Sequence, residues 1–281
     1  MMIESKDNKH FKEFKKLTSV DGVRKYSRVI VSGKKLIKEI SQSAAHSCVA
    51  LITYERYSDD DIEINSIIKS YSDAGSLYTL KKYLYNELDS FNTSAPLLVI
   101  QTPEIPEWDF SLAEGCNLLI PFQDPLNVGA VIRSAAGFGV KNIIMLKEAA
   151  HPFHPRSIRT SGGAVFRYAN LPSLGGRELA GGGLKKTIDA HLFKGPSINE
   201  LKTICGEHKL KIIALDMAGT PINSFTFPKT FLLLPGMEGT GVPEELNETS
   251  LSIPITDSIE SLNAAIAVSI AIFSWKISIA Y

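Results

Sequence analysis

The order of apolar and polar positions divides the chain into two halves, and both alternate apolar runs with helix-like segments. The first half extends to about residue 104. Its short apolar runs predict three strands, over Arg28–Ser32, Cys48–Tyr54 and Pro96–Gln101. Helical spacing predicts helices over Lys34–Ile40 and Leu77–Tyr85. This alternation indicates a small α/β domain.

The second half carries continuous apolar runs, which are typical of a parallel sheet covered on both faces. The predicted strands are Asn117–Ile120, Asn142–Leu146, Lys211–Leu215, Thr230–Leu234 and Leu251–Ile255. Before them, Thr102–Asp109 holds two prolines and three acidic residues and indicates a linker. We therefore expect a small domain over residues 1–104, a linker over 105–116 and a larger domain over 117–281. Glycines at 175–176 and 181–183 predict a flexible loop in the larger domain.

The C-terminal stretch from Leu262 to Tyr281 is apolar enough to be considered as a membrane span, which needs about 20 such residues. Polar residues interrupt it at Asn263, Ser269, Ser274, Lys276 and Ser278. A buried helix therefore fits better than a membrane span. Because Ala264–Trp275 is apolar on every side, we expect it to be buried on every side, including against a second subunit. The sequence thus predicts a homodimer.

The overall composition narrows the class of protein. A chain with 44% hydrophobic and 21% charged residues is typical of a globular protein and excludes a disordered or fibrous one. The polar N-terminus predicts no signal peptide. Cys48, Cys116 and Cys205 lie far apart, so we interpret them as reduced thiols in a cytoplasmic protein. His151 and His154 have no further ligands in metal-like spacing, so no metal site is expected.

Candidate chemistry begins with Asp124 to Val140, which has a helical pattern. Its apolar face consists of Val128, Val131, Ile132, Ala135 and Phe138. The opposite face consists of Gly129, Ala130, Arg133 and Gly137. Small residues around one arginine allow another backbone or a ligand to approach while the cation points at it. The alternative is a helix packed on both sides, with Arg133 in a structural ion pair.

A second candidate segment, Leu232 to Leu246, runs from a buried strand into Gly236, Gly239 and Gly241. Glycine-rich turns after a strand bring backbone groups close to a ligand. The spacing is not that of a dinucleotide-binding or phosphate-binding loop. Glu238 within the turn would repel a phosphate, so a ligand without phosphate, including a cationic one, fits better. The alternative is an ordinary loop.

A third candidate segment, Ser252 to Trp275, begins with a strand that ends at Pro254. The residues Ser261-Leu262-Asn263 then open the apolar helix, and Ser261 is a candidate N-cap. The alternative for Ser261 and Asn263 is a capping role alone.

Taken in this order, the three segments resemble the SpoU family of the SPOUT RNA methyltransferases. The first motif is Asn127-x-Gly129 with Arg133, the second is Gly236-x-Glu238-Gly239, and the third is Ile253-Pro254 followed by Ser261-Leu262-Asn263. They span about residues 117–275. The region around Lys15 to Lys38 is similar, more loosely, to the small substrate-binding domain that often precedes this catalytic domain. There, Ser32-Gly33 stands where such domains often have Glu-Gly.

The resemblance implies a fold, a cofactor and a reaction. The fold would be an α/β domain with a parallel sheet and a deep trefoil knot, acting as a homodimer with the active site at the subunit interface. S-adenosylmethionine would bind in the knot, at positions that match Leu215, Asp216, Gly236, Ile253 and Leu262. A methyl group would pass to a ribose 2′-oxygen of RNA, with ribosomal RNA favoured over transfer RNA. No metal is needed, because the sulfonium is already a good leaving group.

The family's catalytic positions map onto Arg133, Asn127, Glu238, Ser261 and Asn263. The resemblance casts Arg133 as the group that takes or steers the proton. Orienting the adjacent phosphate and stabilising the developing alkoxide is physically easier for an arginine, and both roles stay open. Met237 stands where the family often has asparagine, which gives some weight to a non-catalytic RNA-binding protein with a relic cofactor site. An unrelated dehydrogenase is disfavoured by the missing dinucleotide fingerprint.

Charge is unevenly distributed along a chain whose net charge is zero. Residues 1–40 hold nine lysines and two arginines against three glutamates and two aspartates. The candidate RNA contacts are Lys12, Lys15, Lys16, Arg24, Lys25 and Arg28. Phe11, Phe14 and Tyr26 lie among them as candidate stacking partners. The alternatives are a partly disordered, solvated tail, or aromatic side chains that belong to the core.

Overall fold

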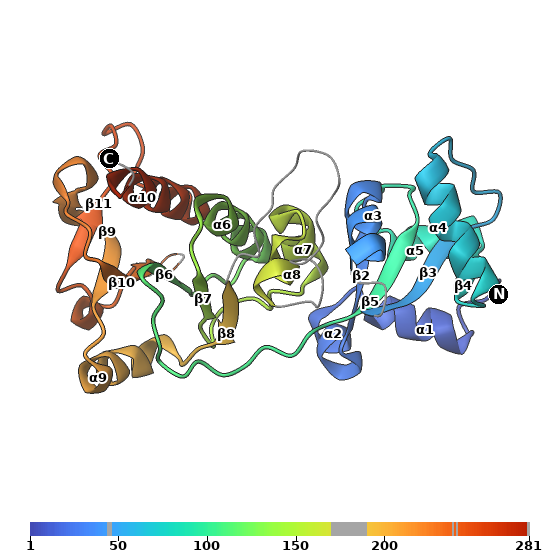
Figure 1. Ribbon diagram of the computed structural model, residues 1–281, viewed down its shortest axis with the longest axis horizontal. Helices are drawn as coiled ribbons and strands as arrows, with labels where there is room; N and C mark the ends of the chain where they lie inside the picture. Colours follow the sequence, from blue (N-terminus) through green and yellow to red (C-terminus); the bar gives the residue numbers. More distant parts are fainter. Residues whose placement is uncertain (44–46, 170–189, 238, 240, 280–281) are drawn as a thin grey trace. The chain divides into compact units, whose positions relative to one another are not determined.

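The computed structural model describes residues 1–43, 47–169, 190–237, 239 and 241–279. It separates into two compact units (Figure 1). Of the described residues, Met1–Pro103 and Phe153–Arg159 form the first unit. The second unit contains Glu104–Pro152, Thr160–Ala169 and the described residues from Ala190 onward. The flexible loop expected around glycines 175–176 and 181–183 lies outside the described residues.

The first unit is built on a five-stranded sheet with the order β1-β4-β3-β5-β2. Its strands are β1 (Met2–Ile3), β2 (Arg28–Ser32), β3 (Cys48–Tyr54), β4 (Leu77–Leu80) and β5 (Leu97–Gln101). β1, β4 and β3 are parallel, whereas β5 is antiparallel to both β3 and β2. The expected small α/β domain is therefore present, with a mixed sheet.

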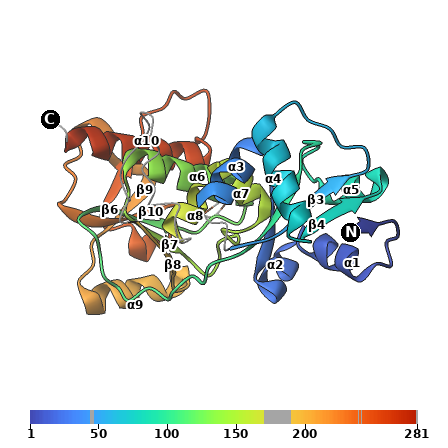
Figure 2. The ribbon, with the colours of Figure 1, turned by 45° about the vertical axis from the view of Figure 1, so that its right-hand side comes forward.

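Helices lie above and below this sheet (Figures 1 and 2). They are α1 (Lys9–Lys16), α2 (Val20–Tyr26), α3 (Lys34–Ser43), α4 (Ile62–Asp73) and α5 (Lys82–Leu88). Phe11 and Phe14 of α1 and Leu84 and Tyr85 of α5 pack in one core with the apolar face of the sheet. The N-terminal segment is thus ordered as helices, which rules out the alternative of a partly disordered tail.

One predicted helix of the first unit is wrong. Leu77–Tyr85 was expected to be helical, but Leu77–Leu80 forms strand β4 and only Lys82–Leu88 is helical. Leu77–Leu80 pairs along its length with Leu51–Tyr54 of β3, and its last two residues also pair with β1. Pairing on both sides of a strand outweighs the local helical spacing of these residues.

The second unit contains a six-stranded parallel sheet with the order β11-β9-β10-β6-β7-β8. Its strands are β6 (Gly115–Ile120), β7 (Asn142–Met145), β8 (His191–Lys194), β9 (Ile212–Pro221), β10 (Thr230–Pro235) and β11 (Ser250–Ser252). The predicted parallel sheet is confirmed. β8 was not predicted, and β9 continues to Pro221 because β11 pairs with its second half.

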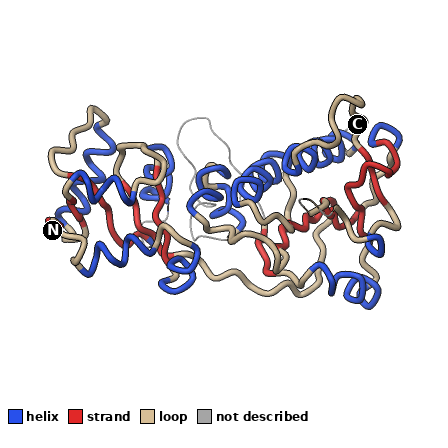
Figure 3. Tube along the Cα trace, turned by 180° about the vertical axis from the view of Figure 1, so that it is seen from behind, coloured by secondary structure: helices blue, strands red, loops and turns tan. Residues whose placement is uncertain are grey.

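Helices cover both faces of the parallel sheet (Figures 1 and 3). α6 (Pro125–Phe138) and α10 (Ala264–Ser278) lie together on one face, and α9 (Ile198–His208) lies on the other. α7 (Pro155–Ser161) and the short α8 (Ala164–Tyr168) follow β7. None of the helices in the described part of the chain is long and apolar enough to cross a membrane. The trefoil knot that the resemblance implies stays a prediction.

The segment expected to be a linker packs against the second unit. Glu107 pairs with Lys194 of β8, and the Trp108 backbone nitrogen donates a hydrogen bond of 2.8 Å to the Lys194 carbonyl. Ile105 and Trp108 are buried, and Trp108 packs against the core beneath α9. Residues 105–108 therefore extend the edge of the sheet instead of forming a free tether.

Candidate functional site

The first motif lies on α6, where this helix leaves the carboxyl end of β6. The Asp124 carboxylate accepts a hydrogen bond of 2.9 Å from the Leu126 backbone nitrogen, and Pro125 occupies the first turn. An acidic N-cap followed by proline is a strong helix start. Asn127 is therefore held in the first turn, at the edge of a parallel sheet where ligands of α/β folds usually bind.

A direct hydrogen bond joins the first and third motifs. The Asn263 side-chain amide donates to Oδ1 of Asn127 over 3.1 Å, across 136 residues of sequence. Asn263 Oδ1 also accepts hydrogen bonds from the backbone nitrogens of Ala265 and Ile266. Asn263, and not Ser261, is thus the N-cap of α10. The candidate cap Ser261 is wrong, whereas the capping role named for Asn263 is confirmed. Ser261 is exposed and precedes the helix.

α6 and α10 pack along each other behind this hydrogen bond. The hydroxyl oxygens of Ser134 and Ser269 lie 2.8 Å apart, and Phe138 contacts Phe273 with ring centroids 5.6 Å apart. On α6, the expected apolar face is buried apart from the half-buried Phe138. The two helices therefore form one packed pair that fixes the relative positions of Asn127 and Asn263.

Arg133 projects from the exposed side of α6. Its guanidinium lies beside the tight turn at Gly162 and Gly163, so close that a Cβ at Gly162 would be 3.9 Å from the Arg133 Cζ. Both glycines have positive φ, at 59° and 82°, so this turn favours glycine. Among the residues that the structure describes, no carboxylate lies within 4.0 Å of Arg133. The alternative of a structural ion pair therefore finds no partner in that part of the chain.

The second motif forms a tight turn directly after β10. The backbone groups of Met237 and Gly241 exchange hydrogen bonds of 2.9 and 3.0 Å, and Gly239 and Gly241 have φ of 88° and 70°. A Cβ at Gly236 would meet the Gly241 Cα at 3.2 Å. Met237 packs its side chain against the core beside α9, which accounts for an apolar residue at that position. Glu238 lies outside the described residues.

The candidate cofactor residues come from neighbouring strand ends. Leu215 of β9 pairs with Pro235 of β10, which places Leu215 and Asp216 beside Gly236. The Asp216 carboxylate accepts hydrogen bonds from the Ala218 backbone nitrogen (2.8 Å) and from the Asn247 side chain (3.1 Å). Ile253 follows β11, and Leu262 precedes Asn263 at the start of α10. Both side chains are half-buried.

The basic residues of the first unit do not form the simple patch that charge alone predicted. Ion pairs join Lys12 to Asp7 (3.0 Å), Lys15 to Glu87 (3.6 Å) and Arg28 to Glu13 (2.7 Å). No ion pair of Lys16, Arg24 or Lys25 with another described residue is found. Half of the candidate RNA contacts are therefore already paired with carboxylates.

Two of the expected stacking partners are core residues. Phe11 and Phe14 are 3% and 4% exposed and pack against α5 and the sheet, so they cannot stack on a nucleotide base. Tyr26 is half-buried against the same core. The alternative that these aromatic side chains belong to the core is thus correct for both phenylalanines.

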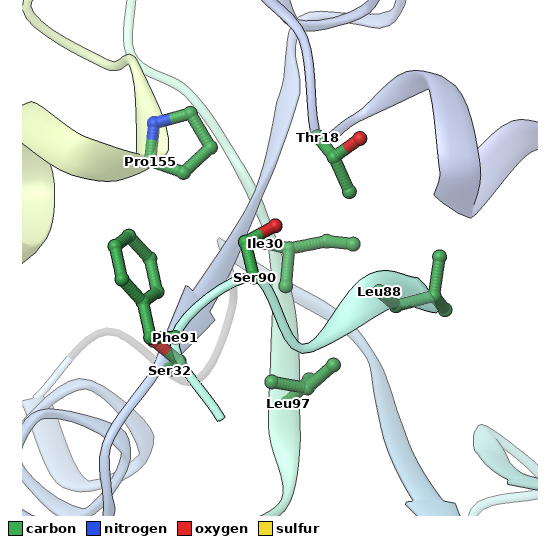
Figure 4. A pocket seen from close by; sticks show the side chains of 8 residues that line it. All are labelled: Thr18, Ile30, Ser32, Leu88, Ser90, Phe91, Leu97 and Pro155. Atoms are coloured by element: carbon green, nitrogen blue, oxygen red, sulfur yellow. The ribbon is translucent and has the colours of Figure 1, made fainter. Parts of the chain in front are cut away.

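Two further candidates for a site can be set aside. A pocket within the first unit, lined by the eight side chains in Figure 4, has a volume of about 10 Å³, enough for about one water molecule. Among the described residues, no three histidine, cysteine, aspartate or glutamate side chains are grouped as a metal site requires.

The sequence from Leu118 to Phe273 matches a family model. The matched residues are 118–173 and 181–273, more than half of the chain, and the model describes the SpoU rRNA Methylase family. The chain belongs to this family. The resemblance that the three motifs carry is thereby confirmed.

Individual relatives extend the match over the whole chain. Ribosomal RNA small subunit methyltransferase G 2 of Syntrophobacter fumaroxidans is 37% identical over 276 residues, which cover 98% of this chain but 49% of that protein. The chain thus spans about half the length of this relative. The 23S rRNA (guanosine(2553)-2′-O)-methyltransferase RlmP of Bacillus subtilis is 24% identical over 283 residues, covering 96% of this chain and 97% of the relative.

The fold of both units is shared with a solved structure. The crystal structure of an AdoMet-bound rRNA methyltransferase from Sinorhizobium meliloti superposes with a TM-score of 0.72 and 18% identity. The alignment covers 99% of this chain and 98% of the other. The expected α/β class, with a parallel sheet in the larger domain and a small α/β domain before it, is thereby confirmed.

Several residues of the site were not assigned a role from the sequence. The pair Asp124-Pro125 is a readable helix start and could have been found. Ser134 and Ser269 could not, because their contact depends on how α6 and α10 pack. The glycine at 162 has a visible signal in the doubled Gly162-Gly163, yet its proximity to Arg133 needs the fold.

Proposed function

We propose that this chain is an S-adenosylmethionine-dependent methyltransferase that methylates a ribose 2′-oxygen of RNA, and that its substrate is ribosomal RNA in preference to transfer RNA. The observation that carries the proposal is the Asn127–Asn263 hydrogen bond, which joins two motifs of the family at the carboxyl edge of the sheet. The named relatives that act on ribosomal RNA support the choice of substrate. Action on ribosomal RNA would place the protein in the cytoplasm.

The strand-end residues fit the proposed cofactor. Gly236 has no side chain, and a Cβ at this position would be 3.2 Å from the Gly241 Cα. The backbone groups of Gly236 can therefore approach a ligand directly. No lysine or arginine occurs from Gly236 to Leu246, and a carboxylate, Asp216, lies beside it. A turn with a neighbouring carboxylate and without basic side chains suits a cationic ligand better than a phosphate. Gly236, Leu215, Asp216, Ile253 and Leu262 would hold the cofactor.

The chain's own polar residues would align and activate the substrate. When bound, S-adenosylmethionine supplies an electrophilic methyl group on a good leaving group. Arg133 would orient the phosphate next to the target ribose and stabilise negative charge on the 2′-oxygen as its proton passes to solvent water. Arg133 is exposed and forms no ion pair with a described residue, so no carboxylate in that part of the chain has to be displaced before it makes these contacts. Asn127, Asn263, Ser261 and Glu238 would shape the pocket around it.

A homodimer completes the proposal. α10 exposes Ile266, Phe273 and Ile277 along one side, with exposed fractions of 53%, 48% and 44%. Its other side, with Val268, Ile272 and Trp275, is buried on the sheet. A contiguous apolar stripe of this kind is typical of a protein–protein interface. A second copy of the chain would cover the stripe.

Replacement of Arg133 tests the proposed activity. The full chain should transfer labelled methyl groups from S-adenosylmethionine to ribosomal RNA taken from cells that lack the protein. Arg133→Ala should lower kcat by roughly 100-fold to 1,000-fold. Because Arg133 is not among the residues proposed to hold the cofactor, calorimetry should show unchanged S-adenosylhomocysteine binding. Lys141→Ala, at an exposed position before β7, is the matched control and should remain fully active.

The outcomes separate the alternatives. Near-normal turnover of Arg133→Ala would remove Arg133 from the reaction. RNA binding without any methyl transfer by the wild-type chain would instead indicate the non-catalytic protein with a relic cofactor site. Tight binding of ATP with no binding of S-adenosylhomocysteine would contradict the proposed cofactor.

A further inference from the structure

A solvent-open hollow lies in the first unit where the parallel strands β3 and β4 end. Tyr54 of β3 pairs with Leu80 of β4, and the Glu55 backbone nitrogen donates a hydrogen bond of 2.9 Å to the Leu80 carbonyl. The hollow has a volume of about 590 Å³ and is lined by Tyr54, Glu55, Arg56, Lys81 and Lys82. None of these residues was among the basic residues expected to contact RNA.

The hollow carries excess positive charge, with three cations against one carboxylate in its lining. Lys81 is neutralised by Glu55 at 2.9 Å and by Glu4 at 3.6 Å. The hydrogen bond from Lys81 holds the pKa of Glu55 below its usual range, so this pair stays ionised. Neither Arg56 nor Lys82 has an ion-pair partner among the described residues.

Aromatic rings fix the position of the Lys82 ammonium. Its Nζ lies 3.2 Å from the ring centroid of Tyr54 and 5.0 Å from that of Tyr85. Tyr54 is held in turn by edge contacts with Tyr57 and Tyr85, at centroid distances of 5.2 and 4.8 Å. A cation over an aromatic face is attracted by the ring but keeps its hydrogen-bond donors free for an anion. Lys82 is therefore ordered without being neutralised.

Arg56 occupies a backbone position that disfavours it. The Tyr57 backbone nitrogen donates to the Tyr54 carbonyl over 3.1 Å, which closes a β-turn with Arg56 as its third residue. Arg56 has φ of 59°, a left-handed conformation that such turns normally fill with glycine or asparagine. An arginine in this conformation is less stable than a glycine would be, and its exposed guanidinium lies at the hollow. Non-glycine residues with a left-handed backbone concentrate at functional sites.

A further carboxylate, three residues after Arg56 in the sequence, is also compensated. Asp59 forms an ion pair with Lys34 at 2.7 Å and a short hydrogen bond with the Tyr57 hydroxyl. These contacts hold the pKa of Asp59 at about 2, with Lys34 as the largest cause. The charge of Asp59 is therefore matched locally. With Glu4 included, three cations at the hollow face two carboxylates, which leaves an excess of one positive charge.

We propose that this hollow is a binding site for the phosphodiester backbone of RNA, in which Arg56 and Lys82 contact phosphate oxygens and Tyr54 positions Lys82. The planar guanidinium matches phosphate oxygens in a two-pronged contact, and an ammonium adds a point charge. The site rests on the proposed function, because it assumes an RNA substrate. It deepens that function by locating the RNA contact of the first unit at the ends of β3 and β4.

Two substitutions separate binding from folding. Arg56→Asn removes the charge but installs a residue that tolerates the left-handed conformation, so the variant should unfold at the same or a higher temperature. Lys82→Met removes the ammonium but keeps an unbranched apolar stem over Tyr54. Lys69→Met, at an exposed position on α4 outside the hollow, is the matched control.

Affinity of the full chain for a single-stranded oligouridine RNA is measured at several salt concentrations. Each hollow variant should lower the affinity roughly tenfold, as expected for a lost hydrogen bond to a charged group. Each should also flatten the slope of log affinity against log salt by about 0.7 per lost phosphate contact. The Lys69→Met control should match the wild type in both. Unchanged affinity and slope in Arg56→Asn and Lys82→Met would overturn the proposal, as would the absence of RNA binding by the wild type.

Calorimetry with S-adenosylhomocysteine distinguishes this proposal from the proposed function. Loss of RNA affinity in the hollow variants supports the hollow even if the wild-type chain fails to bind the cofactor. If the hollow variants bind RNA normally while cofactor binding and methyl transfer persist, the proposed RNA site at the hollow is overturned. The proposed methyltransferase function is then unaffected. Binding of polyglutamate to the wild type in place of RNA would also overturn it, because the occupant would then be an acidic peptide.

Discussion

The side-chain amide of Asn263 donates a hydrogen bond of 3.1 Å to Oδ1 of Asn127, although 136 residues separate them. The same Asn263 side chain caps α10 through its oxygen. One residue therefore begins a helix and ties that helix to the first turn of α6. Any change at Asn263 should affect both the stability of α10 and the geometry of the first motif.

Asn263→Ala should lower the free energy of unfolding by about 1–2 kcal/mol, since it removes an N-cap and one exposed hydrogen bond. Chemical denaturation measures this change. Ser261→Ala is the matched control, and its effect should stay within about 0.5 kcal/mol because Ser261 is exposed and does not cap the helix. The reverse ranking of the two variants would restore Ser261 as the cap.

A double-mutant cycle isolates the bond between the two asparagines. Asn127→Ala combined with Asn263→Ala should show a coupling energy of about 0.5–1 kcal/mol, as for a single exposed hydrogen bond between neutral groups. Strict additivity of the two substitutions would mean that the bond contributes no stability.

Gly115→Ala should be among the most damaging small substitutions in the second unit. Gly115 begins β6 with φ of 97°, and a Cβ there would lie 2.6 Å from Cζ2 of the buried Trp275. Backbone strain and overpacking together should cost about 2–5 kcal/mol, which a denaturation midpoint would report. Gly206→Ala in α9 is the control. Apart from its own helix and chain neighbours, no atom of the described residues lies within 4 Å of its Cβ position, so this variant should be more stable by up to about 1 kcal/mol. Equal stability of the two variants would contradict the packing of Trp275 on β6.

The fold was most predictable where burial on both faces produces an unbroken apolar run. β6, β7 and β10 are of this kind, and the sequence located each within two residues of its ends. β4 failed because Leu77–Leu80 has helical spacing and becomes a strand only through pairing with β1 and β3. β1 has two residues, too few for any periodic pattern to be visible.

The candidate site was predictable as motifs but not as contacts. Asn127 and Asn263 could be named from their segments, whereas their hydrogen bond depends on α6 and α10 packing together. A count of lysines in residues 1–40 does not show that Lys12 and Lys15 face carboxylates, and the RNA contacts expected there stay a prediction. The left-handed conformation of Arg56 could not be predicted, because a positive φ at a non-glycine residue has no signal in the sequence.

Glu200 provides a pH-dependent test of the second unit. Its carboxylate accepts hydrogen bonds from the backbone nitrogen of Ser197 (2.7 Å) and from Lys147 (3.0 Å) at the start of α9. These contacts, led by the Ser197 backbone N–H, lower the pKa of Glu200 from 4.5 to about 2. A carboxylate whose pKa is lower in the folded state than in the unfolded state stabilises the protein at a pH above its unfolded-state pKa. This stabilisation is lost as the pH falls through the folded-state pKa.

Glu200→Gln should therefore lower the Tm at pH 7, and the difference from the wild type should shrink as the pH falls from 4.5 towards 2. Thermal unfolding followed by circular dichroism measures this trend. Glu207→Gln, at an exposed position in the last turn of the same helix, should not lower the Tm at pH 7. A difference between Glu200→Gln and the wild type that stays constant down to pH 3 would contradict the assigned contacts.

The exposed stripe on α10 predicts that the chain self-associates. Ile266, Phe273 and Ile277 lie on one side of the helix, and Phe273 is nearly half exposed. Covering them in a second copy would remove a large apolar area from water, and aromatic residues at the centre of such an interface carry much of its energy. Sedimentation of the wild type should therefore show a dimer at micromolar concentration.

Phe273→Glu places a charge within that interface and should weaken association at least roughly 100-fold, so that the variant sediments as a monomer. Lys202→Glu, an exposed change on α9 across the sheet, is the control and should leave the dimer intact. Methyl transfer should fall together with dimerisation if the site needs both copies, and mixing Phe273→Glu with excess wild type should restore part of the activity. A wild type that sediments as a stable monomer, or a Phe273→Glu variant that remains dimeric, would show that the stripe on α10 is not where two copies of this chain meet.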